Sequence, residues 1–306
     1  MGGEGWLTER FEENRPRLRG VAYRMLGSLS EAEDAVQEAW LRLRHADSET
    51  IENLNGWLTT VVSRVCLDML RGRQLRREES IDAKATEPRV MRGEGADPEG
   101  EAVLADSVGV ALLVVLDTLG PAERLAFVLH DLFGMPFDEI GSIIGRSSGA
   151  AKQLASRARR RVRGSAVRSE SGRARQREVV EAFMKAVRGG DLEGLLAVLD
   201  PDALLHIDAA ARVDGVVRVD APAAEAGKPR ELRGASTWAA QMIALTRGLP
   251  VRFVQMAVID GSVGVILAPR GKLVRAILFR FSDDRITRIE SVADPVRLRQ
   301  LEISVL

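Results

Sequence analysis

The sequence predicts a multidomain protein in which two all-α domains precede one α+β domain. The chain has 306 residues, which is long enough for two or three domains. Apolar residues recur at helical spacing in its first half, whereas β-like runs are confined to its last third. An acidic stretch with three glycines and two prolines interrupts the helical half. We therefore expect helical domains at 1–77 and 107–172, a flexible linker at 78–106 and the α+β domain at 173–306.

Three helices are expected in the first helical domain. Apolar residues at helical spacing within 18–25 form the stripe of the first helix, and a Gly-Ser pair ends it. The second helix places its apolar residues within 32–43 on one stripe, behind an acidic and polar face. A loop at 45–55 has no clean period, and a third helix follows at about 56–71.

The second helical domain ends in a helix-turn-helix pattern. Two apolar stripes, at 112–119 and 125–132, precede a short helix at 138–144. The tight turn Gly145-Arg146-Ser147 then leads into a last helix that runs to about Arg163. A short helix, a turn that contains glycine and a second helix are typical of DNA-binding modules.

The last domain changes from helices to strands along its length. Two helical stripes come first, and β-like runs follow at 204–207, 251–259, 263–267, 273–281 and 286–291. Asp260-Gly261 and Asp283-Asp284 are typical of hairpin turns. Helices followed by hairpin-linked strands predict an α+β domain with an antiparallel sheet.

The net charge of zero conceals strong local charges. The chain has 44 Lys+Arg and 44 Asp+Glu, which taken alone argues against a nucleic-acid-binding protein. Residues 152–177, however, carry ten bases and one acid, whereas the linker 78–106 carries three bases and nine acids. Charges act over about 8–10 Å at physiological salt, so the local excess matters more than the total.

Composition excludes several other classes of protein. Cys66 is the only cysteine and has no partner for a disulfide, and three histidines make a structural zinc site improbable. No apolar run reaches 18 residues, and the N-terminus lacks a secretory pattern. We expect a cytoplasmic, metal-free protein without a cofactor and without a membrane partner.

The last helix of the second domain has the composition of a DNA-reading helix. Small residues at its N-terminus allow that end to enter a major groove, where Lys152 and Gln153 reach base edges. The alternative is a surface helix with a basic face. The residues expected to face the DNA are Ser148, Gly149, Lys152, Gln153, Ser156, Arg157 and Arg160.

Three segments resemble the conserved regions of bacterial sigma factors. The segments 34–43 (DAVQEAWLRL) and 57–64 (WLTTVVSR) resemble the second region, and 146–159 (RSSGAAKQLASRAR) resembles the fourth. Two helical domains joined by a short acidic linker resemble the extracytoplasmic-function group, of the SigJ type. This resemblance covers about 6–75 and 107–164.

The resemblance implies a role for each of these surfaces. The face of Asp34, Gln37, Glu38, Leu41 and Arg42 corresponds to the surface that binds the clamp helices of the polymerase β′ subunit, and the β flap is a further partner. The helix-turn-helix corresponds to the reader of the −35 promoter element. The residues placed at the −10 DNA are Asn53, Asn55, Ser63, Arg64, Asp68, Arg71 and Arg73. For any one of these residues, an ordinary solvated face is the alternative.

The last domain resembles the SnoaL-like fold, a curved sheet wrapped by helices into a cone. The chain departs from relatives with this extension: its linker has no Trp-Leu-Pro-Glu-Pro segment, and 214–218 (DGVVR) replaces Asp-Gly-Gly-Gly-Lys. His206 and Asp208 alternate on an expected strand, and with Trp238 they form a candidate pocket. The favoured alternatives are a polar pair without chemistry and a tryptophan in the core.

The sequence therefore predicts an alternative sigma factor, and not an enzyme. It would bind core RNA polymerase and promoter DNA, and its C-terminal domain would modulate it through intramolecular contacts with the sigma domains. One rival is a one-component helix-turn-helix regulator with a ligand-sensing domain. The other is an enzyme whose chemistry lies in the cone domain.

Overall fold

The computed structural model describes residues 3–46, 51–81, 109–163, 170–210, 229–246, 253–282 and 284–306. By its contacts the chain divides into two compact units. Unit 1 comprises Met1–Val108 and Leu116–Arg160, and unit 2 comprises Gly109–Val115 and Arg161–Leu306. Most of the predicted linker and the 214–218 motif lie outside the described residues.

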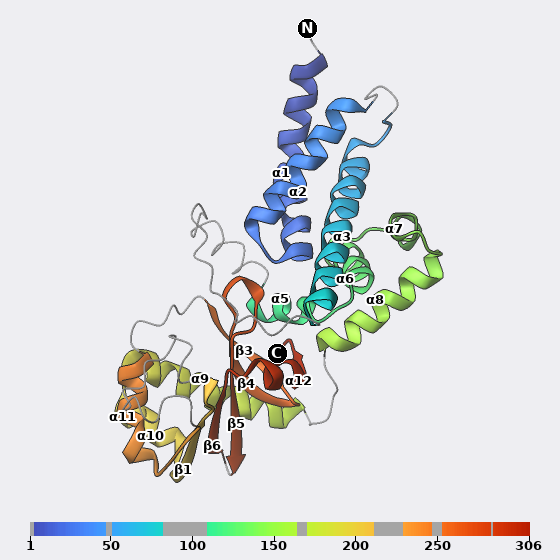
Figure 1. Cartoon of the computed structure of the whole chain (residues 1–306). Helices are drawn as coiled ribbons and strands as arrows, with labels where there is room; N and C mark the ends of the chain where they lie inside the picture. The colour runs from blue at the N-terminus through green and yellow to red at the C-terminus, as the bar shows by residue number, and fades with distance from the viewer. Residues whose placement is uncertain are drawn as a thin grey trace. The chain divides into compact units, whose positions relative to one another are not determined.

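Unit 1 begins with the three predicted helices, which pack against one another (Figure 1). They are α1 (Gly3–Leu26), α2 (Leu29–His45) and α3 (Leu54–Ile81). The stripes that the sequence predicts are buried, with Leu18, Val36 and Leu43 at 0–1% exposure. Helix α3 is longer than predicted at both ends. It begins early because the Asn53 side chain accepts a hydrogen bond from the Gly56 amide, which satisfies a free donor of the first turn.

Four further helical segments of unit 1 include the predicted helix-turn-helix. They are α6 (Pro121–Phe127), the π-helical turn η2 (Val128–Leu132), α7 (Phe137–Ile144) and α8 (Ser148–Arg163, in unit 1 as far as Arg160). Gly145 takes the left-handed conformation at φ 69°, which a residue with a Cβ adopts only at a cost. The Ser147 hydroxyl then accepts from the Ala150 amide at 3.2 Å and caps α8.

Two arginines stabilise the C-terminal end of α1. Arg73 donates to the Leu26 carbonyl at 3.0 Å and pairs with Glu31. Arg124, only 2% exposed, donates from Nε to the Arg24 carbonyl at 3.1 Å. Cations are favourable at this end because the last carbonyls of a helix are unsatisfied and carry partial negative charge. Arg124 therefore connects α6 to α1 inside unit 1.

Unit 2 contains a seven-stranded sheet in the order β2-β1-β6-β5-β4-β3-β7. The strands are β1 (Leu199–Ile207), β2 (Arg230–Arg233), β3 (Val254–Ile259), β4 (Ser262–Leu267), β5 (Arg275–Ser282), β6 (Arg285–Val292) and β7 (Ile303–Ser304). Every pair is antiparallel except β1 and β6, which run parallel. The predicted antiparallel sheet is therefore mixed, because no hairpin joins β1 to β6 and fixes their relative direction.

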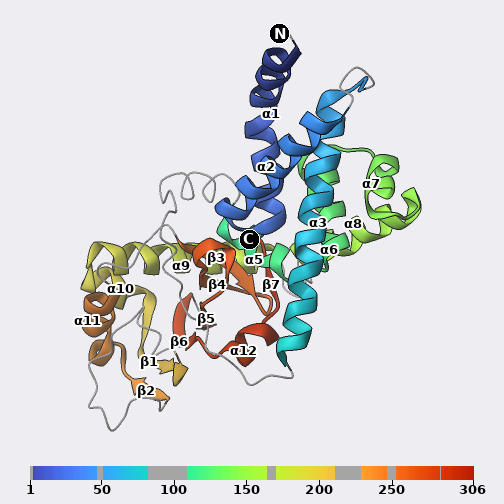
Figure 2. The same ribbon diagram turned by 45° about the horizontal axis from the view of Figure 1, so that its top comes forward.

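Helices cover the apolar face of this sheet. Helices α9 (Glu170–Gly189), α10 (Leu192–Val198) and α11 (Ala235–Thr246) lie together on one side of the strands in both views (Figures 1 and 2). Their apolar residues join those of β1, β4, β5 and β6 in one core, in which Phe183 and Phe279 lie edge to face at 5.2 Å. Unit 2 also holds α5 (Val110–Asp117, as far as Val115), the 3₁₀ turn Pro269–Gly271 and α12 (Pro295–Gln300).

Candidate nucleic-acid and polymerase interfaces

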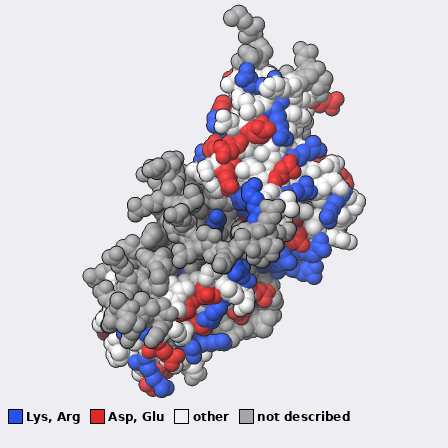
Figure 3. All heavy atoms as spheres, in the orientation of Figure 1, with Lys and Arg blue, Asp and Glu red and all other residues white. Residues whose placement is uncertain are grey.

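Helix α8 separates a buried apolar stripe from an exposed polar face. Ala151, Leu154, Ala155 and Ala158 are 0–4% exposed and attach the helix to unit 1. The opposite face is solvent-accessible, and six of the seven residues predicted for the −35 DNA are exposed on it, with Ser148 half-buried. Figure 3 shows Lys and Arg atoms gathered on the side of the view where α8 lies in Figure 1. The helix thus presents small residues first, then Lys152 and Gln153, then arginines, which suits entry into a groove.

Two arginines of α8 are paired with carboxylates inside unit 1. Arg159 donates from Nε to Asp131 at 2.5 Å, and Arg157 lies 3.2 Å from Glu123. Arg159 is directed toward η2 and orients the helix, whereas Arg157 keeps half of its side chain exposed. Arg160 remains exposed and suits a phosphate contact.

A polar stripe on α3 carries three of the residues predicted for the −10 DNA. Arg64, Asp68 and Arg71 are spaced by four and three residues, so they share one face of the helix, and all three are exposed. Arg71 lies 3.7 Å from Asp68, a loose pair that a phosphate competes with easily. Asn55 is also exposed, nine residues before Arg64, in the first turn of α3.

Three other residues predicted for the −10 DNA are used by the fold. Ser63 is fully buried, so in this structure it does not reach a nucleic acid; it lies on a side of α3 that is buried together with Thr59 and Cys66. Arg73 is held by Leu26 and Glu31, as described above. Asn53 caps α3 with its side chain. The residue type alone does not distinguish these structural roles from a DNA contact.

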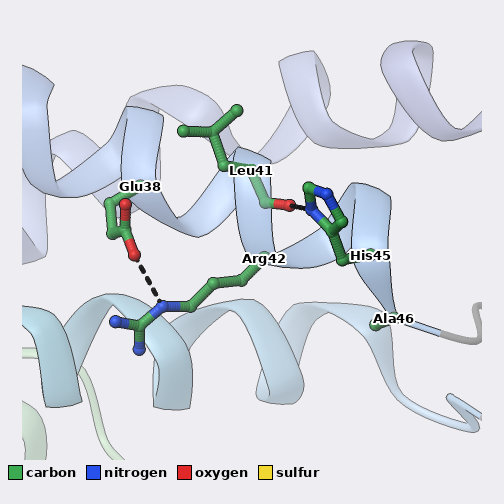
Figure 4. Close-up of a pocket in the computed structure, with 5 residues that line it drawn as sticks. All are labelled: Glu38, Leu41, Arg42, His45 and Ala46. Atoms are coloured by element: carbon green, nitrogen blue, oxygen red, sulfur yellow. Dashed lines mark hydrogen bonds and ion pairs between the residues drawn. The ribbon is translucent and has the colours of Figure 1, made fainter.

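Helix α2 exposes the face predicted to bind polymerase. Asp34, Gln37, Leu41 and Arg42 are exposed, and Glu38 is half-buried and pairs with Arg42 at 2.9 Å. A shallow hollow runs beside this face, lined by Glu38, Leu41, Arg42, His45 and Ala46 (Figure 4). Leu41, 42% exposed, offers apolar area there, and the close-up shows it pointing away from the Arg42 side chain.

The sequence prediction missed His45 and Ala46 at this hollow. His45 Nδ1 lies 2.7 Å from the Leu41 carbonyl and closes the last turn of α2. The helical spacing could have predicted both at this face, because His45 follows Leu41, and Ala46 follows Arg42, by about one helical turn. The sequence predicts a loop from residue 45 on, whereas α2 continues to His45 and Ala46 caps it.

Within unit 2, the three residues of the candidate pocket lie in different environments. Trp238 is fully buried in the core and donates from Nε1 to the Ala203 carbonyl at 3.2 Å. His206 alternates with the core residues Leu205 and Ile207, so it lies on the opposite face of the sheet, 3.8 Å from Glu231. These two side chains therefore do not line one cavity.

Asp208 has a structural role that its environment explains. Its carboxylate is 6% exposed and accepts hydrogen bonds from the Ala293 and Asp294 amides at 2.8 and 2.9 Å. It thereby holds the chain that leaves β6, where Asp294 caps α12. Among the described residues, no group of three or more His, Cys, Asp or Glu side chains is arranged to hold a metal ion. None of the described helices is long and apolar enough to cross a membrane.

Two family models match this chain. The model described as Sigma-70 region 2 matches residues 10–76, and the model described as Sigma-70, region 4 matches residues 109–162. The first match contains the α2 face and the α3 stripe, and the second contains α8.

Similar proteins are known in Mycobacterium tuberculosis. The probable ECF RNA polymerase sigma factor SigI is 42% identical over 203 residues, which cover 66% of this chain and 70% of that protein. The ECF RNA polymerase sigma factor SigJ is 43% identical over 196 residues, which cover 64% of this chain and 62% of that protein. A crystal structure of SigJ is 30% identical, with 95% of this chain and 98% of that chain covered and a TM-score of 0.44.

Proposed function

Because this chain belongs to the extracytoplasmic-function RNA polymerase sigma factors, we propose that it directs core polymerase to promoters through α2, α3 and α8. Its place of action is then the cytoplasm, with the polymerase. The observation that carries the proposal is α8: four residues at helical spacing are buried, and the groove-facing residues on the other side are exposed.

The face of α2 is proposed as the polymerase-binding surface. Helix-on-helix docking needs a central apolar contact and charged groups around it. Leu41 supplies the first, and Asp34, Gln37, Glu38 and Arg42 supply the second. The hollow beside Leu41 offers a place for one apolar side chain of the partner.

The stripe on α3 is proposed to contact the −10 element. Arg64 and Arg71 neutralise phosphates, and capture of an unpaired base takes place in the loop before α3. A duplex must be opened there, at a cost of a few kcal/mol for each flipped base. The exposed face of α3 stabilises the opened strand electrostatically, so we expect its contribution to fall as salt rises.

The C-terminal domain is proposed to modulate this activity from within the same chain. The environments of His206, Asp208 and Trp238 support a structural role and give no acid–base pair. We therefore assign no reaction to this domain. Its effect is expected to be on the availability of the sigma domains for promoter DNA.

The test is promoter-dependent run-off transcription with purified core polymerase, the full chain and a library of genomic promoters. Leu41→Asp is expected to abolish co-purification with core polymerase and all transcripts. Leu192→Asp is the matched control, because Leu192 is 41% exposed and Leu41 is 42% exposed. Lys152→Ala with Gln153→Ala is expected to remove −35-dependent transcripts and leave binding to core polymerase unchanged, and Lys185→Ala serves as its control.

The two rival functions give different outcomes in the same assay. A one-component regulator binds DNA through α8 but forms no stable complex with core polymerase, so no variant of α2 has an effect. An enzyme gives turnover in the cone domain that His206→Ala abolishes without lowering the unfolding midpoint of unit 2, and it gives no promoter-dependent transcript. Absence of promoter-dependent transcript from the full chain would refute the proposed function.

A further inference from the structure

The sheet of unit 2 has an outer face, which is the face opposite α9, α10 and α11. On β3 this face meets α5: Gln255, between two core residues, accepts a hydrogen bond from the Ala111 amide at 2.8 Å. A Cβ at Gly271 would lie 2.8 Å from the Leu113 Cβ, so glycine lets α5 come this close. Helix α12 lies on the other side of the strands from α10 and α11 in both views (Figures 1 and 2). The neighbouring strands β2, β1, β6 and β5 carry charged residues on the outer face instead.

One row across these four strands carries three arginines. The register places Leu204 of β1 opposite both Arg233 of β2 and Arg288 of β6, and it places Arg288 opposite Arg280 of β5. All four directly neighbour core residues of their strands, so their side chains share the outer face. Arg233 and Arg280 are exposed and Arg288 is half-buried. We call these three residues the arginine row.

The arginine row lacks counter-charges. Within the part of the chain that the structure describes, none of its three guanidinium groups lies in an ion pair. Like charges directly opposite each other on one face of a sheet are destabilising, as are those of Arg280 and Arg288. The row therefore suits an anionic surface from outside the sheet.

The adjacent row on the same face carries carboxylates. The register places His206 of β1 opposite both Glu231 of β2 and Glu290 of β6, and it places Glu290 opposite Leu278 of β5. This glutamate row lies two residues along each strand, about 6.7 Å from the arginine row. The Glu231 side chain is 57% exposed. Glu290 binds Arg297 of α12 at 2.6 Å, and a carboxylate has acceptor sites for a second arginine as well.

The two rows are complementary to each other under a two-fold rotation. Consider an axis that lies in the plane of the interface, between the rows and perpendicular to the strands. Rotation about this axis places the arginine row of one copy over the glutamate row of a second copy. Arg233 then meets Glu231 of the second copy and Arg288 meets Glu290, and each contact occurs twice. Two sheets that meet face to face are a common arrangement in proteins.

We propose that the outer face of β2, β1, β6 and β5 is a self-association surface, through which two copies of this chain pair by their arginine and glutamate rows. A nucleic acid would suit the first row but would be repelled by carboxylates about 6.7 Å away, which is less than the screening length of about 8–10 Å. A second copy satisfies both rows. The proposal goes beyond the proposed function and does not depend on it.

The size of the surface sets the expected strength of the dimer. From β2 to β5 there are three strand spacings, which amount to about 15 Å. This patch is small for a stable interface, and its polar contacts are exposed at the rim. We therefore expect a weak dimer, with a dissociation constant in the micromolar range, that dissociates as salt screens the ion pairs.

Sedimentation velocity of the full chain over a range of concentrations tests the surface. Arg233→Glu gives two glutamates and Glu231→Arg gives two arginines in the same strand, so each variant faces like charges in a second copy of itself. Each is expected to weaken dimerisation about tenfold or more. An equal mixture of the two variants is complementary and is expected to restore the dimer. Arg188→Glu and Glu178→Arg change exposed residues of α9, on the other side of the sheet, and are the matched controls.

The outcomes are distinct. An unaltered chain that stays monomeric up to the highest concentration would overturn the proposal, as would a dimer that neither variant weakens. Loss of the dimer in both variants without recovery in the mixture would overturn the pairing of the rows. A monomeric chain whose affinity for duplex DNA falls with Arg233→Glu would assign the arginine row to nucleic acid instead. Recovery in the mixture supports the proposal and shows that both variants fold.

Discussion

Arg124 offers a sharp test of how unit 1 is held together. It is 2% exposed, donates to the Arg24 carbonyl at 3.1 Å and lies 3.6 Å from Asp117. Arg124→Met keeps most of the volume and removes the charge. A hydrogen bond to a charged group contributes about 1.5–3 kcal/mol. Part of this loss is offset because the guanidinium no longer has to be desolvated. We expect unit 1 to lose about 2 kcal/mol.

Cys66 supplies the assay for this change. It is the only cysteine, is fully buried and lies on α3, so a thiol reagent reaches it only when unit 1 opens. A loss of about 2 kcal/mol raises the labelling rate about 30-fold where opening is in rapid equilibrium. The charge of Arg124 acts on the Cys66 thiol in the folded state only, so it leaves the reactivity of the opened state unchanged.

Matched variants control this experiment. Arg42→Met removes an exposed arginine of the same unit whose ion pair with Glu38 is solvent-screened, so we expect a change below about 0.5 kcal/mol. Arg124→Lys keeps the charge but loses the planar fork, and an intermediate effect is expected. A labelling rate within twofold of the unaltered chain for Arg124→Met would refute the role of Arg124.

Three further predictions concern pH, a buried carboxylate and a helix cap. Burial raises the pKa of the Cys66 thiol to about 12, against 9.0 for an ordinary thiol, so only the unfolded chain ionises between these values. The free energy of unfolding is therefore unaffected by this thiol below pH 9 and is lower by about 1.4 kcal/mol at pH 10. Urea unfolding of the unaltered chain and of Cys66→Ala checks this, because the variant lacks the thiol and does not show this part of the fall. Asp208→Ala leaves two amides of unit 2 without their acceptor and is expected to cost about 3 kcal/mol, whereas Asp208→Asn keeps one acceptor and costs less; fluorescence of the buried Trp238 reports both, and equal unfolding midpoints would contradict this role. Asn53→Ala removes the cap of α3 and is expected to cost about 1 kcal/mol, with Asn55→Ala, which removes an exposed side chain two residues further on, as the comparison in thermal unfolding.

Much of the candidate site was predictable because its cause is local. The exposed face of α8 follows from the spacing of Ala151, Leu154 and Ala158, and its start follows from the turn at Gly145. The same holds for the α2 face, where Val36 and Leu43 mark the buried side and Leu41 lies opposite. A helical period needs no knowledge of the partner, only that one face is buried.

Other parts were not predictable because their cause is a distant segment. Ser63 is adjacent to Arg64 and lies on a neighbouring side of α3, shared with Thr59 and Cys66, and its burial depends on what packs against that side. The parallel pairing of β1 with β6 depends on strands more than eighty residues apart. The environment of His206 depends in turn on which face of β1 the helices cover.

The sequence by itself determined most of the helices and five of the seven strands, where the helix-turn-helix lies and which charges it exposes, since each follows from neighbours within one or two turns; β2, β7 and α12 were not predicted. Only the tertiary structure decided where those segments belong. Helix α5 illustrates the difference: seven of its eight residues are apolar, so the stripe predicted at 112–119 does not indicate which face meets a partner. The position of α5 is set by Gln255 and Gly271, about 140 and 160 residues further along the chain. Gln255 accepts a hydrogen bond from a free amide in the first turn of α5, and Gly271 leaves room for the Leu113 side chain.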